Sequence, residues 1–549
     1  MPKVPFWVFI VIAVLYFTAT RVDIMDIDAS QYAEISREMM KSGDYLHVFD
    51  RGLNYLDKPP FLFWVSAASM KVFGVNNFGY RFPSLLFALL AIFATYQLAK
   101  LLYEEKTARM AALVLACCQG MMLWTNDVRC DGILTAWVIT AIWLLKEWFV
   151  KCRWPYLIGG FAAVAFGMMT KGPIALMVPV FAFSCDWALK REWRNFFRPG
   201  YLIGFLVIAI LLVPMCMGLY QQFDLHPETV VNGQKGTSGL RFFFWSQSFG
   251  RITGENPWKN DVDMSFLLQN MLWSYLPWIF LFLPALAINV YRLVKQKFRL
   301  LPGQEWISTG GFLVSYLALG SSSYQLPHYI FVAFPQAAIV TARLIYELVE
   351  EGKYAGLYKV MQPLQTVVGL LILLVTFVLI VYVFPAPAFY IVAWVAGFIF
   401  WMWLAFKRSL QGKMLWLSAA SMVIANIFLT NQVYYTLLQY QVGSQVGKYV
   451  RAYNIPSSDL TAYKFQDALI ALHFYAGEVV GLTDTITNIG DRHYVLAMAP
   501  GLEELHKNGY SFDTLKQGRF YKVSELTPDF LNPRTRDKAV KTYYFVKLK

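Results

Sequence analysis

The sequence predicts a polytopic α-helical membrane protein with about thirteen transmembrane helices and a small C-terminal α/β domain. The first observation is composition: 57% of the 549 residues are hydrophobic and 15% are charged, whereas about 25% are charged in an average soluble domain. The second is a series of apolar runs that approach the roughly 20 residues needed to cross a bilayer. The third is that these runs stop near residue 440, where charges become frequent.

The apolar runs define a membrane domain over residues 1–439. Two neighbouring runs are separated only by Lys171-Gly172-Pro173, and the run 306–320 is short, so these are the weakest spans. We place the spans at residues 4–22, 80–101, 108–124, 132–150, 155–171, 173–189, 200–220, 266–291, 306–320, 327–347, 362–384, 387–406 and 414–436.

The loops between spans predict the orientation. Lys and Arg gather in four loops that fall on the side of the N-terminus when the spans are counted, namely 151–153, 190–198, 292–299 and 407–413. Because cytoplasmic loops of membrane proteins are enriched in Lys and Arg, this side is predicted to be cytoplasmic. The long segments 22–79 and 221–265 and the tail then face outward from the cytoplasmic (inner) membrane.

The tail, residues 440–549, is predicted to be an extracytoplasmic α/β domain. Its short alternating runs, YVLAMA at 494–499 and TYYFVKL at 542–548, are typical of strands. The net charge of +13 raises the question of a nucleic-acid partner. Since the basic residues lie mostly in short loops between spans, orientation in the membrane explains them better, and we expect contacts with membrane lipids and no nucleic acid.

Two acidic residues of the outward segments could do chemistry. Asp28 begins an amphipathic stretch that reads DASQYAEISREMM, and Asp131 stands at the start of the fourth predicted span. Each could instead be the N-cap of its helix, which for both residues is about as strong an interpretation as a functional one.

Basic and aromatic residues occur at the same predicted surface. Lys58 precedes Pro59-Pro60 in NYLDKPPFLFW, where it could bind a lipid phosphate or extend toward headgroups. Arg81 opens the second span, and Arg251 lies in the long loop 221–265. Tyr329 follows His328 in SYQLPHYI, where a lone His is more often a hydrogen-bonded interfacial residue than a ligand.

Carboxylates and cations that converge on one membrane surface suit transfer from a lipid-phosphate donor. The cations neutralise the departing phosphate, and a carboxylate orients or deprotonates the acceptor. The nucleotide-binding pattern GxxxxGK[ST] is absent from the sequence, so the energy would come from an activated lipid. A lipid-linked sugar transporter and a structural envelope protein remain alternatives.

Six motifs in order across residues 20–340 resemble those of a known family. They are DASQYAEISREMMKSGDY, YLDKPPFLFW, FGVNNFGYRFPS, CDGILTAW, MTKGPIALMVPV and QLPHYIFVAFP. The chain resembles the bacterial lipid A 4-amino-4-deoxy-L-arabinose transferases and, more broadly, the protein O-mannosyltransferase-like GT-C glycosyltransferases.

The resemblance implies a GT-C fold with thirteen spans and inverting sugar transfer from undecaprenyl phosphate. It implies Asp28, rather than Asp26, as the catalytic residue of the D-x-x-x-Y-A-E motif, with Asp131 as the second carboxylate. Lys58 is the implied phosphate binder; Arg81, Arg251 and Tyr329 match further donor-binding positions. The implied acceptor is lipid A or another glycolipid, with protein Ser or Thr as the alternative.

The chain departs from the family pattern at two places. Family members commonly carry Glu-Lys-Pro where this chain has Asp57-Lys58-Pro59, and a Glu-His pair where its long loop reads FFFWSQSFGR. Because that His is missing, no cofactor is firmly implied, and a divalent cation is an open but disfavoured alternative. The exact sugar stays open for the same reason.

Overall fold

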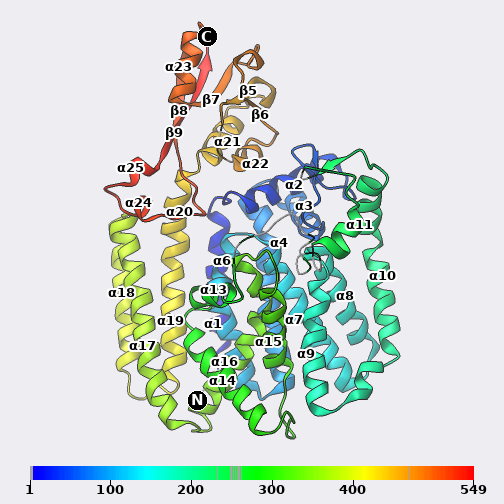
Figure 1. Ribbon diagram of the computed structural model, residues 1–549. Helices are drawn as coiled ribbons and strands as arrows, with labels where there is room; N and C mark the ends of the chain where they lie inside the picture. Colours follow the sequence, from blue (N-terminus) through cyan, green and yellow to red (C-terminus); the bar gives the residue numbers. More distant parts are fainter. Residues whose placement is uncertain are drawn as a thin grey trace.

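The computed structural model describes residues 4–549 except 232, 248, 249, 251, 252, 254, 256–259, 261, 466 and 468. A bundle of long helices carries a strand-containing C-terminal part at one end, and the N-terminus lies at the other (Figure 1). The bundle helices are α1 (Phe6–Thr18), α3 (Phe61–Phe73), α4 (Asn77–Leu102), α5 (Glu105–Ala116), α6 (Gln119–Asn126), α7 (Cys130–Lys151), α8 (Trp154–Lys171), α9 (Ile174–Lys190), α10 (Gly200–Leu219), α13 (Phe266–Ser274), α14 (Ile279–Lys295), α15 (Ile307–Gly320), α16 (Phe334–Val349), α17 (Ala355–Val378), α18 (Ala388–Phe406) and α19 (Lys413–Phe428).

Several of these helices are long and apolar enough to cross a membrane. Within the described residues there are seven, or up to eight if α5 and α6, which meet at 51°, form one span. The chain is therefore a multi-pass membrane protein, but the count of thirteen stays a prediction, since α1, α3 and α15 fall short of full length. The predicted run 266–291 is broken into α13 and α14 near Pro277, which cannot donate a helical hydrogen bond.

The basic loops meet at the end of the bundle that holds the N-terminus. The Arg198 guanidinium lies 5.4 Å from the Trp148 ring centroid, which brings the loop before α10 to the last turns of α7, next to the α7–α8 loop. The backbone N–H of Leu300 donates to the carbonyl oxygen of Leu189 at 3.3 Å, which brings the loop after α14 to the end of α9. For the loops 151–153, 190–198 and 292–299, the predicted grouping on one side therefore has a counterpart in the fold.

Helix α2 (Asp28–Ser42) lies across the other end of the bundle, beneath the C-terminal part (Figure 1). The sequence predicts an amphipathic, outward-facing stretch here, and the structure adds that much of the surface of this helix is buried. Helix α3 packs on one side and α22 (Ile470–Ala476) on another. Even Glu34 and Arg37 are buried, because they form a two-pronged ion pair with N–O distances of 2.6 and 2.8 Å.

The C-terminal part contains a five-stranded mixed sheet in the order β6-β5-β7-β9-β8. Strands β5, β6 and β7 run parallel, whereas β9 pairs antiparallel with β7 and β8. Alternate residues point to opposite faces: Tyr543 and Phe545 pack with α21 and α22, and Val546 and Leu548 pack with α23. The elements are α20 (Tyr434–Leu437), α21 (Val442–Ala452), β5 (Leu460–Tyr463), α22, β6 (Gly481–Thr483), β7 (Tyr494–Met498), α23 (Ala499–Lys507), β8 (Phe512–Phe520), α24 (Pro528–Leu531), α25 (Arg536–Ala539) and β9 (Lys541–Leu548).

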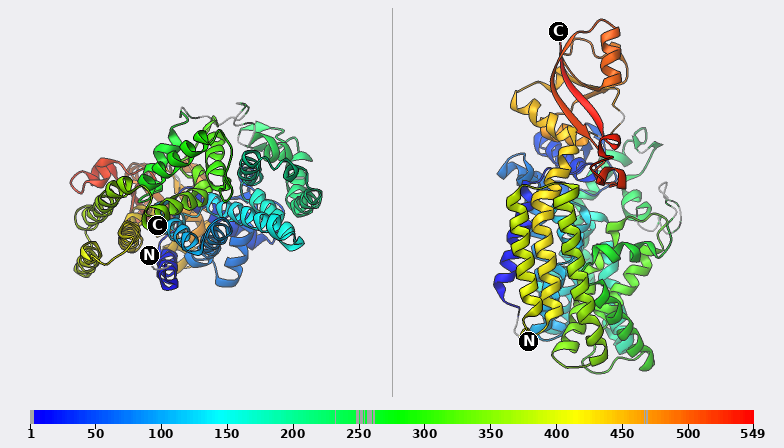
Figure 2. Two further views of the ribbon diagram at one scale, coloured as in Figure 1. Left: turned by 90° about the horizontal axis from the view of Figure 1, so that it is seen from below. Right: turned by 90° about the vertical axis from the view of Figure 1, so that its left-hand side faces the viewer.

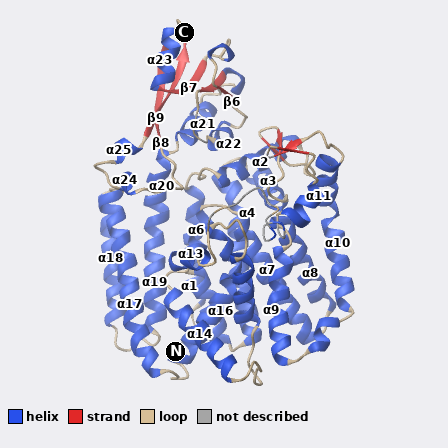
Figure 3. Ribbon diagram, in the orientation of Figure 1, coloured by secondary structure: helices blue, strands red, loops and turns tan. Residues whose placement is uncertain are grey.

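This sheet stands beyond the helical bundle, on the side of α2 (Figure 2). Strands elsewhere in the described chain are two short hairpins near α2 and α11 (Gly239–Arg241) (Figure 3). The hairpins are formed by β1 (Phe49–Asp50), β2 (Leu53–Asn54), β3 (Val230–Val231) and β4 (Gln234–Lys235). The C-terminal sheet and α2 therefore share one end of the molecule, opposite the basic loops.

Candidate active site

A polar cavity of about 170 Å³ lies where α2 meets the ends of the bundle helices. Six separate chain segments contribute to it, including the connections before α3 and α7 and the segment that enters α16. Its lining residues are Asp28, Gln31, Tyr32, Tyr55, Asp57, Lys58, Arg129, Asp131, Lys171, Gln247, Tyr324, Leu326, His328 and Tyr329. The fold thus brings together Asp28, Lys58, Asp131 and Tyr329, four of the six residues predicted from the sequence.

Asp28 is the first residue of α2 and faces the cavity. The N-cap is Ile27, so the N-cap interpretation of Asp28 is wrong. Its Oδ2 accepts a hydrogen bond from Arg129 Nη1 at 2.6 Å. The side chain keeps 39% of its surface exposed, which leaves it accessible to a ligand despite this ion pair.

Asp131 is buried at the start of α7 and is engaged on both oxygens. The N-cap of α7 is Arg129, so the N-cap interpretation fails here too. Lys171 Nζ donates to Asp131 Oδ1, and His328 Nε2 lies 3.5 Å from Oδ2. With only 5% of its side chain exposed, Asp131 holds two neighbouring groups and has little room for a direct role as a base.

Arg129 forms ion pairs with two carboxylates, those of Asp28 and Asp127. Its Nε donates to Asp127 Oδ2 at 2.6 Å, while Nη1 bonds to Asp28 and lies 3.5 Å from His328 Nδ1. Burial by itself lowers the pKa of the Arg129 guanidinium, but Asp127 and Asp28 outweigh burial and raise that pKa. Arg129 is therefore a permanent cation beside the accessible carboxylate of Asp28.

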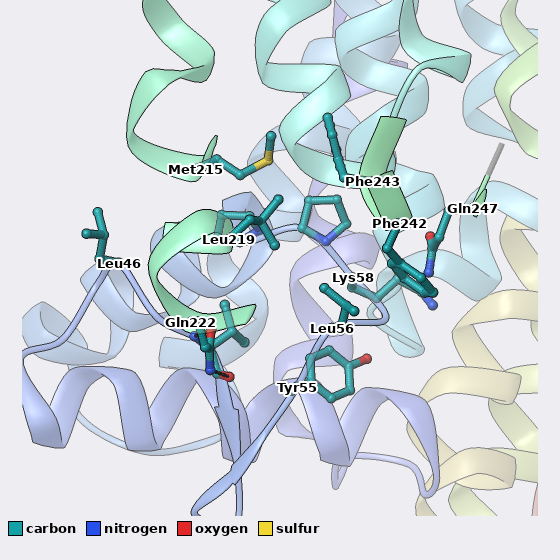
Figure 4. A pocket seen from close by; sticks show the side chains of 13 residues that line it. Leu46, Tyr55, Leu56, Lys58, Met215, Leu219, Gln222, Phe242, Phe243 and Gln247 are labelled. Atoms are coloured by element: carbon teal, nitrogen blue, oxygen red, sulfur yellow. Dashed lines mark hydrogen bonds between the residues drawn. The ribbon is translucent and has the colours of Figure 1, made fainter. Parts of the chain in front are cut away.

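Lys58 supplies a second cation, from the connection that leads through Pro59 and Pro60 into α3. Its Nζ donates to the Asp57 carbonyl oxygen at 3.4 Å and forms no ion pair within the described ranges. Lys58 also borders an apolar pocket of about 20 Å³, room for roughly one water. Figure 4 shows Lys58 next to Phe242 and Gln247 in this pocket.

Lys171 is the third cation, and it lies against Tyr329. The Nζ atom sits 3.8 Å from the centroid of the Tyr329 ring, close enough for a cation–π interaction. Tyr329 belongs to η5 (Pro327–Ala333), a 3₁₀ segment that leads into α16. The resemblance matches Tyr329 to a donor-binding position, and the structure places Tyr329 in the cavity wall.

One of the predicted residues, Arg81, does not line this cavity. Arg81 is 1% exposed, and its donors reach main-chain oxygens of Val22, Asp23 and Asn126. It fastens the connection between α1 and α2 to α4 and α6, a structural role that local sequence did not reveal. Arg251 lies outside the described residues.

Arg129, Lys171 and His328 also line the cavity, although no role was predicted for them from the sequence. Their signals were present: Arg129 lies two residues before Asp131, and Lys171 is a lone charge between apolar runs. Gln31 and Tyr55 gave no signal, because their place in the cavity depends on tertiary contacts. Among the described residues, no three His, Cys, Asp or Glu side chains form a group suited to a metal ion.

Comparison with known proteins identifies the fold class. The family described as dolichyl-phosphate-mannose-protein mannosyltransferase matches residues 57–217. Two solved structures of ArnT from Cupriavidus metallidurans, apo and bound to undecaprenyl phosphate, superpose with TM-scores of 0.71 and 0.73 at 17% identity. Each superposition covers 98% of this chain and 97% or 98% of the other. The chain has the GT-C fold.

Sequence relatives narrow the resemblance. The undecaprenyl phosphate-α-4-amino-4-deoxy-L-arabinose arabinosyl transferase of Edwardsiella ictaluri is 28% identical over 59% of this chain. The corresponding transferase 1 of Pseudomonas fluorescens is 26% identical over 63%. The chain spans 56% and 58% of these two relatives. The resemblance drawn from the motifs is confirmed: the chain is similar in sequence to aminoarabinose transferases and, over residues 57–217, to the mannosyltransferase family.

Proposed function

We propose that the protein is an inverting glycosyltransferase that moves a sugar from undecaprenyl phosphate, or a similar polyprenyl phosphate, to lipid A or another glycolipid. The observation that carries the proposal is a single cavity in which the accessible carboxylate of Asp28 faces the cations of Lys58, Arg129 and Lys171. This is the charge arrangement that transfer from a lipid phosphate requires.

In the proposed reaction, the acceptor oxygen forms a bond to the anomeric carbon while the bond from that carbon to the phosphate oxygen breaks. The polyprenyl phosphate leaves with the bonding electrons, and Lys58 and Lys171 stabilise its negative charge. Asp28 orients the acceptor or receives its proton. Because phosphate is already a good leaving group, positioning and electrostatics supply most of the rate.

Asp131 has a different role in this proposal. Both of its oxygens are engaged, by Lys171 and His328, and it is nearly inaccessible. Asp131 would thus hold the Lys171 cation toward Tyr329 and the donor phosphate, and Asp28 would act on the acceptor. This assignment gives different roles to Asp28 and Asp131, which the sequence alone predicts equally as candidate catalytic carboxylates.

The lipid chain of the donor would lie on the apolar side of Lys58. The pocket beside Lys58 continues to Met215 and Leu219 near the end of α10, a helix with many exposed apolar side chains. A phosphate at Lys58 would then have its prenyl chain along α10, within reach of the bilayer. The small present volume requires side chains such as Phe243 to move when the chain enters.

The proposed topology has thirteen spans in a membrane domain, residues 1–439, and an extracytoplasmic α/β domain, residues 440–549. The basic loops lie at the end of the bundle opposite α2 and the cavity. With that end in the cytoplasm, as the excess of Lys and Arg favours, the cavity opens on the periplasmic side of the inner membrane.

A purified-protein assay tests the proposal. The protein in detergent is incubated with a panel of undecaprenyl-phosphate sugars and lipid A, with and without chelator, and product is detected by mass spectrometry. Formation of a sugar–lipid A product is expected. Detergent has no two sides, so product formation excludes a pure transporter, and no product with any donor would overturn the proposal.

The acceptor is tested separately in a deletion strain. Loss of a sugar from lipid A supports the glycolipid acceptor, whereas loss of a glycan from envelope proteins supports a protein acceptor. The matching family description names a protein mannosyltransferase, so the envelope proteins are the necessary second measurement.

A further inference from the structure

Asp26 lies two residues before the proposed catalytic Asp28, yet it faces the C-terminal part and not the cavity. It is 8% exposed. Its Oδ1 accepts hydrogen bonds from Ser30 Oγ at 2.5 Å and from the backbone N–H of Ala471 at 3.0 Å. Its Oδ2 is buried without a hydrogen-bond partner in the described part of the chain. A buried carboxylate in this state needs a function that offsets its desolvation.

The donor N–H of Ala471 belongs to the first turn of α22, where backbone N–H groups have no partner within the helix. Asp26 satisfies this group from 445 positions away in sequence. Through Ser30, the same oxygen also holds the first turn of α2. One carboxylate oxygen therefore joins the starts of two helices that belong to different parts of the molecule.

Further bonds attach the same connection to the C-terminal part. The backbone N–H of Asp26 donates to Gln441 Oε1 at 2.7 Å, and Gln441 Nε2 donates to the Ile24 carbonyl oxygen at 3.0 Å. The backbone N–H of Ile24 donates to the Tyr475 hydroxyl at 2.8 Å. Residues 22–27 are not helical, so α1 does not determine where α2 begins; these side chains do.

We propose that Asp26 is a positioning residue that fastens the first turn of α2 to α22 and so fixes Asp28 against the cavity. The inference rests on the proposed function for the role of Asp28, and it adds a task for the C-terminal part, which helps to build the active site from outside the bundle. Transfer rates are sensitive to misplacement on this scale, since a shift of about 1 Å in a reacting group can cost about 100-fold.

Asp23 lies in the same connection as Asp26 but has different partners. Asp23 pairs with Lys448, whose side chain is 48% exposed, so this contact with α21 is open to solvent. Asp23 is buried like Asp26, but its carboxylate accepts from Lys448 on α21 and from Asn77 on α4. Asp26 is the carboxylate of this connection that bonds to α2 itself and to α22.

The test compares three substitutions in the full-length protein. Asp26→Ala removes the acceptor; Asp26→Asn keeps an oxygen in the place of Oδ1; Asp26→Ser is a milder truncation in case the alanine variant does not fold. Lys41→Ala is the matched control, because the exposed Lys41–Glu478 pair joins the far end of α2 to the segment after α22. Steady-state transfer and hydrogen exchange of residues 28–32 and 471 are measured for each.

We expect Asp26→Ala or Asp26→Ser to lower kcat 10-fold or more, with the KM for the donor changed less than threefold, and to speed exchange of the Ala471 amide and the first turn of α2. Asp26→Asn should stay within about twofold of wild type, as should Lys41→Ala. Unchanged kcat and exchange in the truncated variants, or an equal loss in Asp26→Asn, would overturn the inference.

The exchange measurement separates this inference from the proposed function. If wild type shows no transfer with any donor, the proposed function fails, and unaltered exchange in α2 then also rejects the positioning role. If wild type is active and only the Asp26 variants behave unexpectedly, the inference alone fails.

Discussion

Charged residues form clusters at both ends of the helical bundle, and the two clusters differ in what they surround. The cavity cluster consists of Asp28, Lys58, Arg129, Asp131, Lys171 and His328. At the opposite end, Glu347 accepts from Arg292 at 2.7 and 3.1 Å, and Arg343 Nε lies 3.4 Å from Glu347. Arg343 extends this end cluster to Glu351 at 2.8 Å.

The end cluster joins α14 to α16 and, through Glu104, to the segment before α5. Its charged side chains form ion pairs that hold helices together. In the cavity cluster, Asp28 is accessible, and Lys58 stands across the cavity without a described ion pair. Charge at a helix end is therefore not evidence of a site by itself; accessible charge of both signs around a common cavity is.

The sharpest test of this contrast is Asp28→Asn. Loss of the carboxylate should reduce kcat by about 10²–10⁴-fold, the usual range for a proton-transfer or orienting group. Folding and donor binding should persist, because Asn still accepts from Arg129. Transfer kinetics and binding of undecaprenyl phosphate by the purified variant measure both effects.

The matched control is Asp127→Asn. Asp127 is the other carboxylate that pairs with Arg129, and it does not line the cavity. It should lower kcat much less than Asp28→Asn does. Near-normal turnover of Asp28→Asn, or equal losses in both variants, would mean that Asp28 has no special position.

At the end cluster, we expect a substitution to lower stability and to leave kcat unchanged. Glu347→Gln leaves the Arg292 and Arg343 guanidinium groups without their shared, buried carboxylate. Because both cations are partly exposed, the loss should be about 2 kcal/mol of unfolding free energy, below the range for fully buried pairs. Thermal unfolding in detergent should shift downward while kcat of the folded fraction is unchanged. A kcat loss at constant stability would contradict the contrast.

The sequence predicted best those features that depend on neighbouring residues in the chain. The apolar runs predicted a multi-pass helical protein, and the motifs around Asp28 and Lys58 led to the GT-C resemblance. Asp131 and Tyr329 also reached the cavity as expected. These residues sit beside recognisable helix starts, so their neighbours in sequence are also their neighbours in space.

Other features could not be predicted because they depend on distant contacts. The burial of α2 comes partly from α22, more than 400 residues later, so the amphipathic pattern alone could not show what covers this helix. Arg81 opens a predicted span at the outer surface, yet it binds main-chain oxygens of the α1–α2 connection and of the last residue of α6. The exact number of spans was beyond reach because short apolar helices and breaks such as that near Pro277 have the same composition as true spans.

A smaller effect is expected from Lys58→Ala. Loss of one cation of three should weaken binding of undecaprenyl phosphate about 10-fold, equivalent to about 1.4 kcal/mol, with a modest change in kcat. Lys58→Arg should recover part of the affinity, and Lys41→Ala should leave it unchanged. Titration at two salt concentrations measures these affinities; the same affinity for wild type and Lys58→Ala would remove Lys58 from the phosphate site.

The smallest effect concerns stability and pH at Asp26, between the cavity and the C-terminal sheet. Burial raises its pKa from 3.8 to about 6, against the lowering effect of the Ser30 and Ala471 hydrogen bonds. The nearby ionisable groups are Tyr475 on α22, Arg81 on α4 and the Asp23–Lys448 pair. None of them forms an ion pair with Asp26 in the described structure.

Because the folded-state pKa of Asp26 is higher than that of an unfolded Asp, the folded protein takes up a proton as pH falls through about 6. Its contribution to stability is therefore present at low pH and lost as pH rises through 6. Between pH 7 and pH 5 the wild type should gain about 1 kcal/mol relative to Asp26→Asn. Thermal unfolding of both proteins across this range measures the difference; parallel curves would mean that Asp26 is ionised and well solvated, and that the connection to α22 is looser than the fold indicates.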